Sequence, residues 1–121
     1  MNILEVKNVT KSFGKLLVIN NLSFDVKQGE IFGIAGPNGA GKTTLFNLIT
    51  GVYKYNGNIY FDQENITNLR TYILCQKGIA RTFQLPLVFP TMTVYDNIKI
   101  GANFGNVGKK ESEKNEFVDK I

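Results

Sequence analysis

The chain has 121 residues, of which 43% are hydrophobic and 20% charged, a composition typical of one modest globular domain or of a piece of a larger one. Its formal net charge of +4 comes from scattered lysines without a basic run, so we expect no nucleic-acid partner. The absence of an apolar run of about 18 residues excludes a membrane span, and a single cysteine without any histidine excludes an internal disulfide and argues against a zinc site or a histidine-based triad.

The first thirty residues predict a pair of antiparallel strands. Extended segments over residues 3–6 and 16–26 are joined by a turn at Gly14. Glu5 and Asn8 interrupt the apolar stretch that a signal peptide needs, so we expect no export signal and a cytosolic chain.

A strand, a glycine-rich loop and a helix are expected next. Residues 31–35 are apolar, as in a strand that is buried on both faces of a sheet. Residues 36–43, Gly-Pro-Asn-Gly-Ala-Gly-Lys-Thr, match the phosphate-binding pattern G-x-x-x-x-G-K-[ST]. Residues 44–49 have the apolar spacing of a helix, and Gly51 provides a stop signal. This order predicts an α/β fold with a P-loop.

The loop residues indicate nucleotide chemistry. Glycines allow backbone N–H groups to turn inward around phosphate oxygens, and the helix N-terminus adds the positive end of its dipole. We expect Lys42 to reach the β- and γ-phosphates and the Thr43 hydroxyl to bind Mg²⁺. The alternative is a glycine-rich turn without a ligand.

Further elements are predicted with weaker signals. A helix opened by the capping box of Thr93 and Asp96 is expected to run to residue 100. The other expected elements are a strand over 57–61, a helix over 68–76 with Leu69, Ile73 and Cys75 inward, a strand over 78–83, an irregular segment over 85–90, a loop over 103–108 and a charged helix over 109–121.

Five stretches together resemble the ATP-binding-cassette (ABC) ATPases, the motor subunits of membrane transporters. The sequence of residues 36–44 is typical of that family, and residues 4–14 and 22–30 are similar to its first strands. Residues 79–84 and 90–98 are similar to its Q-loop region in the branched-chain amino-acid importer group. The resemblance covers residues 2 to about 104.

The resemblance implies a set of site residues for ATP and Mg²⁺. Phe13 stands where an aromatic ring stacks on adenine, although it could instead be a core residue, and Val18 contacts the other side of the base. Gln84 stands at the Q-loop position that touches Mg²⁺ and the attacking water, so Thr43 and Gln84 are the metal residues and Lys42 and Gln84 the catalytic ones. The implied phosphate cradle consists of Asn38, Gly39, Ala40, Gly41, Lys42, Thr43 and Thr44.

The resemblance also implies partners. The apolar loop over residues 85–90 stands where the family receives a transmembrane permease subunit, unless it folds into its own helical subdomain. A second ATP-binding subunit, identical or paralogous, is implied as well. We therefore expect a cytoplasmic protein that is peripheral on the inner face of the cell membrane.

Several parts that hydrolysis needs in this family are missing from the sequence: an acidic strand that holds Mg²⁺, a following Glu base, an LSGGQ-like helix start and a switch histidine. Residues 58–62, which end in Asp62, are the nearest match to the acidic strand, but the turn at Gly57 assigns them to the antiparallel β-subdomain. The fold class is thus an incomplete α/β P-loop NTPase core with an N-terminal antiparallel β-subdomain and without the C-terminal half. Residues 1–104 comprise the β-subdomain, P-loop and Q-loop, and residues 105–121 begin a truncated helical subdomain.

Three function classes stay open. The first is a transport ATPase subunit, here its N-terminal half from a truncation or a split reading frame. The second is another P-loop enzyme such as a kinase, which the strands before the P-loop disfavour. The third is a nucleotide-binding or assembly module without turnover. For the isolated chain we expect nucleotide binding without hydrolysis, and marginal stability unless another chain covers residues 31–35.

Overall fold

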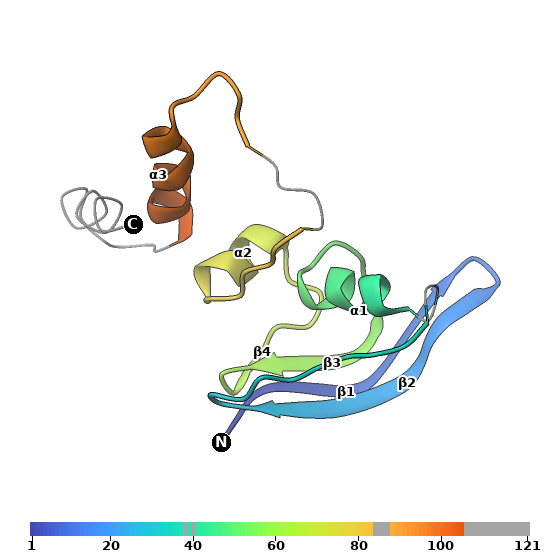
Figure 1. Ribbon diagram of the computed structural model, residues 1–121. Helices are drawn as coiled ribbons and strands as arrows, with labels where there is room; N and C mark the ends of the chain where they lie inside the picture. Colours follow the sequence, from blue (N-terminus) through green and yellow to red (C-terminus); the bar gives the residue numbers. More distant parts are fainter. Residues whose placement is uncertain (38, 40, 84–87, 106–121) are drawn as a thin grey trace. The chain divides into compact units, whose positions relative to one another are not determined.

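The computed structural model describes residues 1–37, 39, 41–83 and 88–105, and the chain divides into two compact units, residues 1–71 and 72–121. The first unit contains a four-stranded antiparallel sheet in the order β2-β1-β3-β4, together with helix α1 (Figure 1). The strands are β1 (Asn2–Phe13), β2 (Leu16–Lys27), β3 (Asn56–Phe61) and β4 (Glu64–Asn65). The predicted antiparallel β-subdomain is confirmed.

The hairpin of β1 and β2 is longer than predicted. Its turn contains Gly14 at φ 61, as expected, but β1 continues beyond residue 6 because its polar residues pair with β2 up to Phe13. A bulge between Val6 and Val9, with Asn8 at φ 51, shifts the register there. The bulge brings both valines, three residues apart, into the core, where each is almost fully buried.

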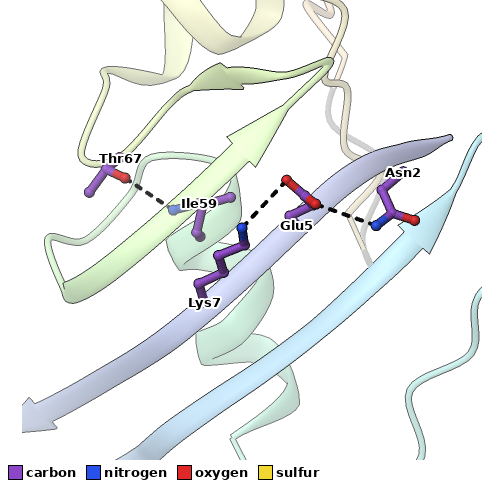
Figure 2. A network of polar contacts seen from close by, with 5 residues as sticks. All are labelled: Asn2, Glu5, Lys7, Ile59 and Thr67. Carbon is purple, nitrogen blue, oxygen red and sulfur yellow. Dashed lines mark hydrogen bonds and ion pairs between the residues drawn. The ribbon is translucent and has the colours of Figure 1, made fainter.

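A small polar network lies at the start of β1 (Figure 2). The Glu5 carboxylate accepts a hydrogen bond of 3.3 Å from the Asn2 amide and lies 3.9 Å from the Lys7 ammonium. On β3, the Ile59 backbone N–H donates to the Thr67 hydroxyl at 3.0 Å. The Glu5 and Lys7 side chains are partly exposed, so the ion pair contributes little stability.

Helix α1 (Lys42–Ile49) begins two residues earlier than predicted and ends where predicted. Leu45 and Leu48 are buried and join the core of the first unit. At its C-terminus Gly51, at φ 80, donates its N–H to the Leu48 carbonyl at 3.1 Å, and Val52 donates to the Asn47 carbonyl at 2.8 Å. This pair of bonds is a Schellman motif, which explains why a glycine stops the helix.

The expected strand over residues 31–35 is wrong. The segment is irregular, Ile31 is fully exposed, and Phe32 is held by stacking on Phe24 of β2 at a centroid distance of 5.2 Å. A strand buried on both faces needs neighbouring strands for its backbone hydrogen bonds, and among the described residues no strand pairs with this segment.

The next helix, α2 (Thr71–Gln76), starts later than the predicted residue 68. Asn68 has φ 56, which is not helical, and its side-chain amide is bonded to the Tyr55 backbone. Leu74 is buried and Cys75 exposed, so the predicted inward face is wrong at Cys75. The predicted strand over 78–83 is also wrong, because these residues are irregular and pair with no strand in the described part of the chain.

The last described helix is α3 (Val94–Gly105). Its predicted start is confirmed, because the Thr93 hydroxyl accepts the Asp96 backbone N–H at 3.1 Å. The predicted end at residue 100 is wrong: Gly101 does not adopt a positive φ, and the helix continues past the buried Ala102. The expected loop over 103–108 is therefore helical to residue 105, and its remainder and the expected helix over 109–121 lie outside the described residues. Of the helices described, none has the length and apolar character that crossing a membrane requires.

Candidate functional site

A cavity of about 440 Å³ in the first unit brings together residues that are far apart in the sequence. The end of β1, the start of β2 and the N-terminus of α1 all contribute side chains or backbone. Its described lining residues are Phe13, Val18, Gly39, Gly41, Lys42, Thr43 and Thr44. These are the predicted adenine-side residues together with the described members of the predicted phosphate cradle.

The loop before α1 has the backbone shape of an anion site. Gly39 and Gly41 adopt φ values of 86 and 92, in the left-handed region that backbone anion-binding nests use. Gly41 is the N-cap of α1, no side chain caps the helix, and its first turn contains no acidic residue. The free N–H groups and the positive end of the helix dipole therefore stay available to an anion.

Gly41 also sets the distance between this loop and β2. A Cβ atom at this position would lie 3.2 Å from Val18 Cγ1 and 3.3 Å from the Val18 carbonyl oxygen. The absence of a side chain at residue 41 therefore lets the loop approach the strand that carries the base-side residue Val18.

Lys42 and Thr43 are placed for phosphate and metal chemistry. The Lys42 ammonium donates to the Gly36 carbonyl, which keeps the charge inside the loop. The exposed Thr43 hydroxyl lies on the first turn of α1 and is a hard oxygen donor that fits Mg²⁺. Groups of three or more acidic, cysteine or histidine side chains that could hold a metal ion are absent from the described residues.

Phe13 forms the aromatic end of the cavity. Its side chain is 40% exposed, which disagrees with the alternative of a core aromatic. The ring meets Tyr53 edge-to-face at 5.2 Å between centroids, and the Lys11 ammonium lies 4.9 Å from its centroid. No sequence motif identifies Lys11 or Tyr53 as neighbours of the site, because lysines are common in strands and tyrosines in loops. Only the fold brings the two residues into contact with Phe13.

Three predicted site residues, Asn38, Ala40 and Gln84, lie outside the described residues, as do residues 85–87 of the predicted docking loop. The described part of that loop is exposed, with Val88 at 69% and Phe89 at 56%. The Phe89 backbone is fixed from α3, because the Asn97 side chain accepts its N–H at 2.8 Å and donates to its carbonyl at 3.2 Å.

Tyr55 is a buried tyrosine directly before β3 whose ionisation is shifted by its surroundings. Burial raises the pKa of its phenol above the ordinary value of 10, although hydrogen bonds from Asn68 and Thr67 oppose the shift. The phenol is therefore neutral at physiological pH.

Residues 19–121 match the ABC transporter family. The chain belongs to this family. Membership confirms the resemblance found in residues 36–44, and it decides against a P-loop kinase. Roles of individual residues in this chain do not follow from the match alone.

Curated relatives of this cassette differ in what they import. One is a "probable branched-chain amino acid transport ATP-binding protein" of Methanocaldococcus jannaschii, 43% identical over 84% of this chain and 40% of its own length. Another is an "Fe(3+) ions import ATP-binding protein" of Fusobacterium nucleatum, 38% identical over 89% of this chain and 29% of its own length. The chain thus spans less than half of either protein.

Solved structures confirm the fold class. An ATP-binding cassette in its ADP conformation superposes with a TM-score of 0.77 at 38% identity, over 97% of this chain and 46% of that one. A dimeric cassette bound to ADP and phosphate superposes with a TM-score of 0.76 at 28% identity, over 97% and 54%. The described fold is therefore that of part of an ABC ATPase cassette.

Proposed function

We propose that this chain binds ATP with Mg²⁺ in the cavity at the N-terminus of α1, and that it represents part of the ATP-binding subunit of an ABC importer. The observation that carries the proposal is the cavity itself. It joins an exposed aromatic ring, Phe13, to a glycine loop with a lysine and an uncapped helix start. An adenine base and a polyphosphate chain need those two ends in one cavity.

Each residue in this proposal has a distinct role. Phe13 and Val18 hold the base, and the backbone around Gly39 and Gly41 binds the phosphates together with Thr44. Lys42 exchanges its bond to the Gly36 carbonyl for the β- and γ-phosphate oxygens. Thr43 is a Mg²⁺ ligand, and the ion neutralises phosphate charge when bound. Asn38, Ala40 and Gln84 keep the roles predicted for them: Asn38 and Ala40 in the phosphate cradle, and Gln84 at the metal and the attacking water.

Titration calorimetry tests the binding proposal. The chain should bind Mg·ATP or Mg·ADP, weakly because its aromatic end is exposed, and Lys42→Ala should lower the affinity at least about tenfold by removing the charge on the phosphates. Lys27→Ala, an equal change of charge on an exposed lysine at the far end of β2, is the matched control and should leave binding unchanged. No heat at millimolar nucleotide with a folded chain would refute the proposal.

The imported solute is proposed to be a branched-chain amino acid. Two observations support this choice: the sequence of residues 79–84 and 90–98, and the 43% identity to the relative from Methanocaldococcus jannaschii. An Fe(3+) importer is the competing candidate, favoured by the 38% identical relative from Fusobacterium nucleatum. The alternative for the chain by itself is a nucleotide-binding or assembly module without turnover.

The proposed partners are transmembrane permease subunits and a second ATP-binding subunit, which place the protein on the cytoplasmic face of the cell membrane. The dimeric cassette among the solved structures supports the second subunit. Val88 and Phe89 support the permease contact, because apolar side chains on a backbone anchored by Asn97 form a defined exposed surface.

Co-purification tests the permease contact in the full-length subunit. Phe89→Asp should reduce recovery of the permease subunits at least about tenfold, because an unpaired charge buried at an apolar contact is costly. Tyr72→Asp, on an exposed ring of α2, is the matched control. Equal recovery with Phe89→Asp and wild type would mean that the loop serves its own subdomain.

A further inference from the structure

Phe13 contacts two residues that are not among the described lining residues of the cavity. Tyr53 contacts the ring at an interplanar angle of 83° and a centroid distance of 5.2 Å. The Lys11 ammonium lies 4.9 Å from the Phe13 centroid and 5.7 Å from the Tyr53 centroid. One cation therefore links both rings, and the described lining of the cavity includes Phe13 but neither of its two neighbours.

The position of the Lys11 ammonium is itself fixed by the backbone. Its Nζ donates to the Lys54 carbonyl at 2.7 Å, one residue beyond Tyr53. The bond ties the end of β1 to the segment that connects α1 to β3. The two rings contact each other and each contacts the Lys11 ammonium, which the bond to Lys54 holds in place. Each ring is nevertheless about 40% exposed.

We propose that Lys11 and Tyr53 are positioning residues that hold the Phe13 ring in the orientation that receives the nucleotide base. The proposal rests on the proposed function, because it concerns the same cavity. Two physical effects support it. An exposed ring that is already packed loses less freedom when a base stacks on it. The ammonium also draws electron density from the ring, so the open surface of Phe13 repels the π-electrons of a purine less.

The structure offers a matched control on the same strand. Lys7 also lies over an aromatic ring, with its ammonium 5.1 Å from the Tyr60 centroid, and it is not among the described lining residues of the cavity. Figure 2 shows its pairing with Glu5. Lys7→Met and Lys11→Met therefore change the net charge equally, and each removes a lysine from an aromatic ring, one ring for Lys7 and two for Lys11. Only Lys11→Met acts on Phe13.

The first measurement compares ATP with inorganic tripolyphosphate, which lacks a base. Tyr53→Leu and Lys11→Met should each weaken ATP binding about two- to fivefold relative to tripolyphosphate binding. Tyr53→Phe keeps the ring, so its ratio of the two affinities should equal that of wild type. Lys7→Met should leave the ratio unchanged. Lys42→Ala should weaken both ligands together.

The second measurement needs no ligand. The chain contains no tryptophan, so Phe13→Trp provides a single tryptophan at residue 13, which red-edge excitation selects over the five tyrosines. Adding Tyr53→Leu should lower its fluorescence anisotropy, and adding Lys7→Met should not, with circular dichroism confirming the fold of each variant.

The outcomes separate the two proposals. If wild type binds ATP and the ratio of the two affinities is the same in Tyr53→Leu and Lys11→Met, the positioning role is wrong while the nucleotide site stands. If wild type binds tripolyphosphate but shows no preference for ATP, the base contact is wrong. If it binds neither ligand, the proposed function fails, and the positioning role fails with it.

Discussion

At Gly57 the backbone of β3 passes so close to β1 that no side chain fits. A Cβ atom there would lie 2.4 Å from the Asn8 carbonyl oxygen and 2.8 Å from Val9 Cα, and the residue has φ +102. Gly57 lies opposite the β1 bulge, where the pairing of β1 with β3 changes register between Lys7 and Thr10. The bulge that buries Val6 and Val9 therefore depends on a glycine in the neighbouring strand.

Gly57→Ala should destabilise the chain by about 2–4 kcal/mol, because strain at the positive φ adds to a clash with backbone atoms. Gly29→Ala is the control, since Gly29 has φ +80 but nothing within 4 Å of the added methyl group, so only strain of about 1–2 kcal/mol is expected. Urea unfolding measures both. Equal losses would show that β1 moves away without cost and that the close approach does not matter.

Among the elements, those with local signals could be predicted from the sequence. The phosphate loop and α1 are encoded by adjacent glycines, Lys42 and the stop at Gly51, and the start of α3 is encoded by the Thr93 cap. The strand over 31–35 could not be predicted correctly, because a strand also needs a partner for its backbone, and hydrophobicity carries no information about the partner. The same holds in reverse for β1, whose polar second half forms a strand because β2 pairs with it.

The candidate site divides in the same way. Phe13, Val18 and the described loop residues come together in one cavity, as the family resemblance implied. Lys11 and Tyr53 could not be predicted, because their contacts depend on where the connection from α1 to β3 crosses the end of β1. A motif specifies the residues that touch a ligand, whereas their support is set by tertiary packing.

In the whole molecule, the described cavity and the residues proposed to link it to the permease belong to different units. Every described lining residue of the cavity lies within residues 1–71. Gln84 and the exposed Val88 and Phe89 belong to residues 72–121. The proposed nucleotide contacts of the described residues thus lie in the first unit, while the link from nucleotide to permease is proposed to run through the second.

The proposed roles predict that the 121-residue chain binds ATP without hydrolysing it. Phosphoryl transfer depends on positioning an attacking water and on neutralising charge around the γ-phosphate, and both tasks require several groups at once. The sequence contains no histidine, and the described residues contain no cluster of acidic side chains that could hold the metal. We also propose that a second cassette completes the site, and the dimeric state of the neighbour bound to ADP and phosphate supports this. We therefore expect Lys42 and Thr43 alone to support binding without turnover.

Phosphate release measured over hours at saturating Mg·ATP should therefore equal that of Lys42→Ala, within the background of the assay. Calorimetry on the same sample must show bound ATP, so that lack of turnover is not confused with lack of binding. Release well above the Lys42→Ala level, removed by a Thr43→Val change, would show that the chain assembles a complete catalytic site. In that case the attacking water would have to be oriented by residues of this chain or of a second copy, and a rate that rises with the square of protein concentration would identify the second copy as the source.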